Sequence, residues 1–202
     1  MKQGAPAPQI AAVILAAGAS SRMGRPKARL LWNNETFLAH LCGRARECSC
    51  APVVVVYGAH DIADIVPPDI EAVHNRIWQK GQLSSLQRGI VAISPYSAEV
   101  THLLVLTVDR PRVCMKTIAA LIRAGRGETQ AVWQPAYRGQ RGHPVLYPRH
   151  LVPRLLALPP TGSARDLTAR AEVSPLRRSL DVDDPAVLEN FDSPEDLDDL
   201  LR

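Results

Sequence analysis

The chain has 202 residues, of which 46% are hydrophobic and only 4% aromatic, and its formal net charge is +4. This length fits one domain with a substantial core that Val, Leu, Ile and Ala must fill. The basic excess consists of scattered arginines, without a basic stripe or neighbouring stacking aromatics, which argues against nucleic-acid binding and suits an anionic small ligand.

Membrane insertion and secretion are also disfavoured. The longest apolar run, residues 10–17, is too short to span a bilayer, and the N-terminus MKQGAPAPQ lacks the pattern of a cleavable signal. The pair Cys48 and Cys50 lacks the second pair that a zinc site would need. We therefore expect a soluble, cytoplasmic protein with reduced thiols, a flexible tail over residues 1–9 and one domain over residues 10–202.

Strands and helices are predicted to alternate through the first 125 residues. Short apolar runs rich in β-branched residues predict buried strands, and apolar residues at helical spacing predict helices. The predicted strands are 10–17, 52–58, 70–75 and 102–109, and the predicted helices are 36–47, 83–93 and 115–126. The unbroken run of four valines in 52–58 indicates a strand covered on both faces, as in a parallel sheet.

The remaining residues are less regular. They predict two β segments around a glycine-rich turn within 129–148, helices at 149–158 and 163–171, a strand-like segment at 173–182 and an acidic helix at 193–201. Together with the first half they predict an α/β fold with a three-layer, Rossmann-like, mostly parallel sheet and helices on both faces. In such sheets ligands bind beyond the carboxyl ends of the strands, so the residues that follow each strand are the candidates for a site.

The loop after the first predicted strand has the composition of a phosphate-binding loop. Its small residues let backbone N–H groups approach an anion closely, and Ser20 adds a hydroxyl donor. Arg22 and Lys27 add positive charge. The loop suits a triphosphate although it contains neither G-x-x-x-x-G-K-[S/T] nor G-x-G-x-x-G. By spacing alone, an ordinary solvated loop is the alternative.

The same loop reads L-A-A-G-x-S-x-R-M-G-x-x-K without a gap over residues 15–27. This pattern resembles the signature of the MobA-like nucleotidyltransferases, and within them the molybdenum cofactor cytidylyltransferases. Four further segments resemble that family in the same order, so that the likeness covers nearly the whole chain: 75–89, Asp109-Arg110-Pro111, Gly142-His143-Pro144 and 192–197. The resemblance implies a fold of the nucleotide-diphospho-sugar transferase type and a Mg²⁺-dependent transfer of CMP from CTP to molybdopterin, with release of pyrophosphate.

The resemblance also implies roles for individual residues. It places the nucleotide against Leu15, Ala16, Ala17, Gly18, Ser20, Arg22, Lys27, Asn75, Gly81, Ser84 and Ser85. In the expected reaction Lys27 binds the α-phosphate and Arg22 the β- and γ-phosphates. The acceptor is expected at Gly142, His143 and Pro144, with no need for His143 as a base because the acceptor phosphate is already ionised. Residues 161–166 match an acceptor motif loosely, and a helix start capped by Ser163 explains them equally well.

Two aspartates are the candidate Mg²⁺ ligands. Asp109 ends a predicted buried strand, where a carboxylate is costly unless it is paired or binds a cation. Capping of the next turn is the alternative for Asp109, and capping of the following helix is an equally good explanation of Asp192 from the residues alone. The resemblance favours metal binding by both. The chain departs from the family at Asn190, where an acid is common, and at Arg110, where an uncharged residue is usual.

The choice of base rests on resemblance as well. Ala17 and residues 81–86 look more like the cytidylyl branch than the guanylyl branch, which implies CTP as donor and a phosphorylated pterin as acceptor. A guanylyltransferase or a sugar-1-phosphate nucleotidyltransferase is the close alternative. A non-catalytic nucleotide- or cofactor-binding accessory protein, such as a maturation chaperone for a target molybdoenzyme, is a different class. The joint presence of Arg22, Lys27, Asp109 and Asp192 disfavours it. An NAD(P)H-dependent oxidoreductase would need a glycine fingerprint that the chain lacks.

Overall fold

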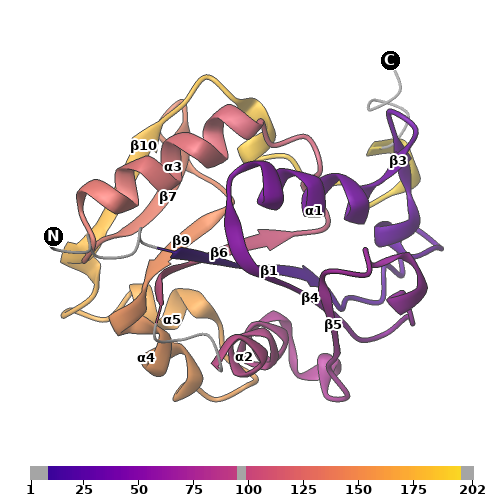
Figure 1. Cartoon of the computed structure of the whole chain (residues 1–202), viewed down its shortest axis with the longest axis horizontal. Coiled ribbons are helices and arrows are strands. Elements are labelled where there is room, and N and C mark those ends of the chain that lie inside the picture. Colours follow the sequence, from indigo (N-terminus) through magenta and orange to yellow (C-terminus); the bar gives the residue numbers. More distant parts are fainter. Residues whose placement is uncertain (1–8, 95–98, 197–202) are drawn as a thin grey trace, which may run out of the picture.

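The computed structural model describes residues 9–94 and 99–196, and its central feature is one twisted sheet (Figure 1). The sheet order is β10-β7-β9-β6-β1-β4-β5, with β8 paired to β7. Only β9 and β8 run antiparallel to their neighbours among these described strands. The strands are β1 (Gln9–Ala16), β4 (Cys50–Tyr57), β5 (Glu71–His74), β6 (Val100–Thr107), β7 (Val132–Tyr137), β8 (Gln140–Arg141), β9 (Val145–Pro148) and β10 (Arg177–Asp181).

Helices cover both faces of this sheet (Figure 1). One face carries α1 (Phe37–Glu47) and α3 (Met115–Gly127), and the other carries α2 (Gln82–Ile93), α4 (Val152–Leu156) and α5 (Ala164–Thr168). A small separate hairpin joins β2 (Leu31–Trp32) to β3 (Glu35–Thr36). The predicted three-layer, mostly parallel α/β fold is therefore confirmed. No helix in the described ranges has the length and apolarity to cross a bilayer.

Strand β1 lies in the middle of the sheet and is buried on both sides. Its side chains alternate between the two faces, as the period of a strand requires. Ile10, Ala12 and Ile14 pack in the cluster that includes α1 and α3, whereas Ala11, Val13 and Leu15 pack in the cluster that includes α2. Helix α2 approaches β1 closely at Gly89, where an added Cβ would stand 2.7 Å from a Val13 methyl group. This packing fixes the start of α2 beside the end of β1.

Two predicted strand boundaries are corrected by the structure. Gln9 is already the first residue of β1, while the rest of the predicted tail lies outside the described residues. Strand β6 ends at Thr107 and not at Asp109, because the backbone turns there: Arg110 N donates to Thr107 O at 3.1 Å. Asp109 therefore lies in the turn that follows β6.

The predictions for the last third of the chain were too long. The segment 149–158 is a 3-10 turn (Arg149–Leu151) followed by α4, and 163–171 contains only the five residues of α5. The segment 173–182 begins as a 3-10 turn (Ser174–Leu176), where Pro175 has no N–H for a sheet ladder, and only β10 is a strand. The predicted terminal helix starts at Pro194, and its part beyond Asp196 lies outside the described residues.

Candidate active site

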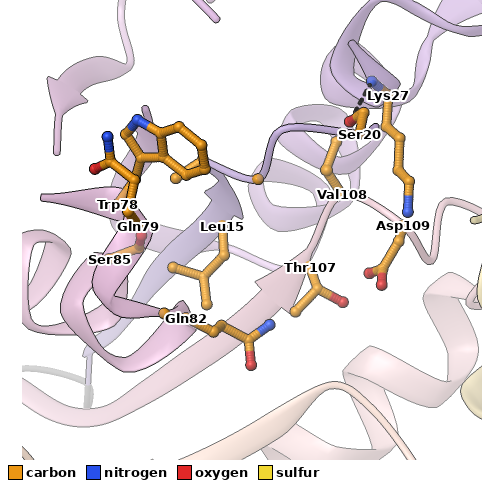
Figure 2. Close-up of a pocket in the computed structure, with 13 residues that line it drawn as sticks. Leu15, Ser20, Lys27, Trp78, Gln79, Gln82, Ser85, Thr107, Val108 and Asp109 are labelled. Carbon is orange, nitrogen blue, oxygen red and sulfur yellow. Dashed lines mark hydrogen bonds between the residues drawn. The ribbon is translucent and has the colours of Figure 1, made fainter. Parts of the chain in front are cut away.

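A cavity of about 330 Å³ opens at the carboxyl ends of β1 and β6, where the sheet connections diverge to either side (Figure 2). This is the place at which a doubly wound sheet leaves room for a ligand. We call it the nucleotide cavity. Among the residues expected to bind nucleotide or metal, the following line it: Leu15, Ala17, Gly18, Ser20, Lys27, Gly81, Ser85 and Asp109.

The phosphate loop, residues 17–27, is folded by its own hydrogen bonds. Ser20 has a φ of +51°, and its carbonyl accepts from Met23 N at 3.0 Å and from Gly24 N at 3.1 Å. The Ser20 hydroxyl accepts from Lys27 N at 3.3 Å. These bonds turn the chain back on itself, so that the Lys27 side chain, only 12% exposed, reaches over the cavity toward Asp109 (Figure 2). The expected role of Ser20 as a nucleotide ligand stays a prediction.

Asn75 and Ser84 lie behind the cavity wall. Asn75 Nδ2 donates to the hydroxyls of Ser84 and Ser85, both at 2.9 Å, and Ser84 donates to Gly81 O at 2.7 Å. Asn75 and Ser84 are almost completely buried. The structure thus shows them holding the start of α2, and it brings Gly81 and Ser85, not Asn75 or Ser84, to the cavity surface.

Several cavity residues were missed or underrated from the sequence. Trp78 lines the nucleotide cavity together with Gln79, Gln82, Thr107 and Val108. The Thr107 hydroxyl is buried and has no hydrogen-bond partner among the described residues. The position of Thr107 at the end of a strand, two residues before Asp109, was the available signal. Ala16, by contrast, was expected at the nucleotide and is not among the lining residues.

Asp109 has an unsatisfied carboxylate oxygen. Its Oδ1 is buried and finds no hydrogen-bond partner in the described parts of the chain. Burying an ionised carboxylate oxygen without a partner costs free energy unless a cation binds it. The Asp109 carboxylate is therefore suited to bind a divalent metal ion. Its backbone carbonyl accepts from Phe191 N at 3.0 Å, which brings the segment that contains Asp192 alongside.

Asp192 is bound to the two cations of the phosphate loop. Its Oδ2 accepts from Arg22 Nη2 at 2.8 Å, and its Oδ1 is in contact with Lys27 Nζ. The hydrogen bond from Lys27 is the main cause that lowers the pKa of Asp192. The helix start is instead capped by Asp196, whose Oδ2 accepts from the N–H groups of residues 192 and 193. No cluster of three or more His, Cys, Asp or Glu side chains suited to a metal occurs within 9–94 and 99–196.

A second, larger cavity of about 640 Å³ adjoins the first. We call it the acceptor cavity, because Gly142 and His143 line it as expected, whereas Pro144 does not. Gln82 lines both cavities, so they are neighbours. Ser163 caps α5 by accepting from Arg165 N at 3.1 Å and also lines the acceptor cavity. The two explanations of residues 161–166 are therefore compatible.

His143 is uncharged at neutral pH. Burial, and to a smaller extent the positive charge of Arg110, lower its pKa from 6.5 to about 4, against the opposing effect of Asp109. Arg110 itself donates from Nη1 to Val187 O at 2.8 Å and to Glu189 O at 2.9 Å. Arg110 thereby ties the turn after β6 to the segment that leads to Asp192.

Comparison with known proteins identifies the family of the chain. The sequence profile of the MobA-like NTP transferase domain matches residues 12–175. The nicotine blue oxidoreductase of Paenarthrobacter nicotinovorans is 31% identical over 160 residues, which cover 72% of this chain and 74% of that protein. The molybdenum cofactor guanylyltransferase of Rhizobium leguminosarum bv. trifolii is 31% identical over 200 residues, covering 94% and 90%. The molybdenum cofactor cytidylyltransferase of Escherichia coli K12 is 24% identical over 191 residues, covering 91% of each chain.

Solved structures show the same fold. Rv0371c from Mycobacterium tuberculosis H37Rv superposes with a TM-score of 0.78 at 24% identity, over 96% of this chain and 98% of that one. The 4-diphosphocytidyl-2C-methyl-D-erythritol synthase of Anaerococcus prevotii superposes with a TM-score of 0.75 at 14% identity, over 96% and 94%. These likenesses bear out the predicted nucleotide-diphospho-sugar transferase type of fold. From the profile match and the 31% identical relatives, the chain belongs to the MobA-like NTP transferase family.

Proposed function

We propose that this chain transfers a nucleoside monophosphate from a nucleoside triphosphate to the phosphate of a molybdopterin-type acceptor and releases pyrophosphate. One observation carries the proposal. Lys27 and Arg22 of the phosphate loop contact Asp192 close to Asp109, at the opening of the nucleotide cavity. The acceptor cavity, which adjoins it, is lined by arginines. Cations for a triphosphate, carboxylates for a metal and room for an anionic acceptor are thus adjacent, as nucleotidyl transfer requires.

In the proposed reaction an oxygen of the acceptor phosphate forms a bond to the α-phosphorus while the bond to the β-phosphate oxygen breaks. Lys27 neutralises charge on the α-phosphate, and Arg22 binds the β- and γ-phosphates. Backbone N–H groups near Gly18 hold the departing pyrophosphate. The protein's contribution is therefore orientation and electrostatic stabilisation. His143 stays neutral, and the acceptor phosphate needs no base.

Magnesium is the proposed metal, held by Asp109 and Asp192. Its charge would neutralise the phosphate oxygens in the transition state. The buried, unpartnered Oδ1 of Asp109 supports this assignment. A structure of Rv0371c in complex with manganese superposes on this chain with a TM-score of 0.70 at 23% identity. Asp192 joins a metal only after its present contacts with Arg22 and Lys27 open, which frees both cations for phosphates.

GTP is the first candidate for the donor and CTP the second. The relatives named guanylyltransferases include proteins 31% and 30% identical to this chain, whereas the one named cytidylyltransferase is 24% identical. This favours the guanylyl alternative over the cytidylyl transfer that Ala17 and residues 81–86 implied. CTP remains the second candidate because of those same residues, of which Ala17, Gly81, Gln82 and Ser85 line the nucleotide cavity.

A thermal-shift panel tests the proposal, with GTP, CTP, ATP, UTP and NADPH, each with and without Mg²⁺. A ligand at about 100 times its Kd stabilises a fold by roughly 2.7 kcal/mol, so binding is readily visible. A Mg²⁺-dependent shift with GTP is expected, and the same shift with CTP alone would select the cytidylyl reaction.

Turnover separates the enzyme from an accessory protein. Pyrophosphate release from the bound triphosphate is expected once molybdopterin is added, and triphosphate binding without any release would indicate a carrier or chaperone. A shift with NADPH and with no triphosphate would overturn the proposal and favour an activity like that named for the oxidoreductase relative.

A further inference from the structure

The acceptor cavity is lined by more positive charge than one phosphate needs. Its lining includes four arginines and no aspartate or glutamate: Arg110, Arg141, Arg165 and Arg177. The remaining polar lining consists mainly of neutral amides, hydroxyls and the uncharged His143. A cavity of this composition selects anions.

None of these four arginines has an acidic partner among the described residues. No carboxylate there lies within ion-pair distance, 4.0 Å, of any of them, and Arg110 binds backbone carbonyls instead. The Nε of Arg177 and the Nδ1 of His143 are both buried and lack any hydrogen-bond partner there. The Arg177 Nε–H is a buried donor that is costly to leave unpaired, so the cavity suits a ligand that supplies an acceptor.

Arg178, the next residue after Arg177, does have an acidic partner. Arg178 points to the opposite face of β10, as alternation along a strand requires, and pairs with Glu128 at 2.7 Å and 3.2 Å. The missing partner is therefore a property of the cavity side and not of the whole strand. On that side Arg141 donates from Nε to Ser179 at 2.6 Å, two residues along β10 from Arg177. Arg141 and Arg177 thus belong to one wall.

That wall lies far from the end of the acceptor cavity that is next to Asp109. Strand β10 is separated from β6, which leads into Asp109 and Arg110, by β7 and β9. Three strand spacings of about 4.8 Å give a separation on the order of 14 Å between the backbones of β6 and β10, and the long arginine side chains shorten the gap that a ligand must span. A single phosphate group is still too small to reach both ends of the cavity at hydrogen-bond distance. One phosphate that reacts near Asp109 leaves Arg141 and Arg177 without an anion.

We propose that the acceptor carries a second anionic group, separated from its reacting phosphate, and that Arg141 and Arg177 bind this group. The acceptor class is a phosphate monoester with a remote carboxylate or comparably charged centre. Arg110 lies at the end of the cavity proposed to hold the reacting phosphate. Arg165, on α5, is the fourth arginine of the lining. The inference rests on the proposed function in one respect: the proposed function identifies the end of the acceptor cavity that holds the reacting phosphate.

Binding of two six-carbon probes tests the inference on the full chain at constant ionic strength. The probes are 6-phosphogluconate and sorbitol 6-phosphate, which differ only in a terminal carboxylate in place of a hydroxymethyl group. We expect calorimetry to show at least 10-fold tighter binding of 6-phosphogluconate. Equal binding of the two probes, including no binding of either, would overturn the inference.

Variants of single arginines test whether this wall causes the preference for 6-phosphogluconate. Arg177→Gln and the exposed Arg141→Gln are each expected to reduce the ratio of the two affinities at least 5-fold, whereas the matched control Arg178→Gln keeps it. An unchanged ratio in both cavity variants would overturn the assignment to this wall. The triphosphate panel on the same protein separates the two hypotheses. Triphosphate binding with equal probe affinities would refute only the second anion, and a preserved probe preference without triphosphate binding would refute only the transferase.

Discussion

The Lys27 ammonium is in contact with the Asp192 carboxylate, although 165 positions of chain separate them. Arg22 binds the other oxygen of the same carboxylate at 2.8 Å. The group proposed to hold a metal therefore neutralises the two cations proposed to hold the triphosphate. This contact must open before phosphates reach Lys27, and it links the C-terminal segment to the first loop of the chain.

Replacing Asp192 with Asn is expected to strengthen triphosphate binding without metal, because Lys27 and Arg22 lose their competing anion. Partly exposed ion pairs contribute about 0.2–1 kcal/mol, so the gain is about 1.5- to 5-fold in Kd measured by calorimetry in EDTA. Turnover with Mg²⁺ falls in the same variant because a proposed ligand is lost. Asp183→Asn, at an exposed site, is the control. Weaker binding of Asp192→Asn in EDTA would contradict the competing role.

Lys27→Ala is expected to lower kcat by about 10²–10³-fold, the usual loss when one donor to a developing charge is removed. Pyrophosphate release at saturating substrates measures this effect. The exposed Lys116→Ala controls for loss of one positive charge. Near-normal turnover of Lys27→Ala would remove this residue from the α-phosphate.

Gly142→Ala is expected to destabilise the fold by about 3 kcal/mol, at the upper end of overpacking effects. An added Cβ would stand 2.1 Å from Val187 O, a backbone atom that cannot swing away. Urea denaturation measures the change. Gly127→Ala, where nothing lies within 4 Å of the new Cβ, should shift stability by no more than about 1 kcal/mol. Equal midpoints for the two variants would contradict the tight contact at Val187.

His143 is expected to titrate near pH 4 in the folded protein, because burial and Arg110 lower its pKa from 6.5, with Arg165 acting in the same direction and Asp109 against. In the unfolded chain it takes up a proton near 6.5. The unfolded state therefore binds more protons between these values, so this residue makes the protein less stable as pH falls from about 6.5 to about 4. His143→Gln should show a shallower loss over that window. An imidazole NMR titration with a midpoint near 6.5 would disprove the burial effect.

Local signals in the sequence were enough for most of the sheet and its covering helices. The valine run of β4 and the apolar run of β1 predicted strands buried on both faces. The helix predicted over 36–47 is α1, and the Thr36 side chain caps its start by accepting from Ala39 N at 3.1 Å. These features depend on neighbours a few residues apart, which a sequence displays directly.

Within the candidate site, the residues alone were enough to single out the loop 17–27 and the two candidate aspartates and to suggest the family. The assembled fold was needed to show that Asn75 supports the start of α2 instead of facing the cavity, and that Asp192 binds Lys27. It alone brought Arg141 and Arg177 to one cavity wall. The reason is physical: the orientation and partners of a polar side chain depend on groups that come from distant strands, and those distances exist only after the sheet has assembled.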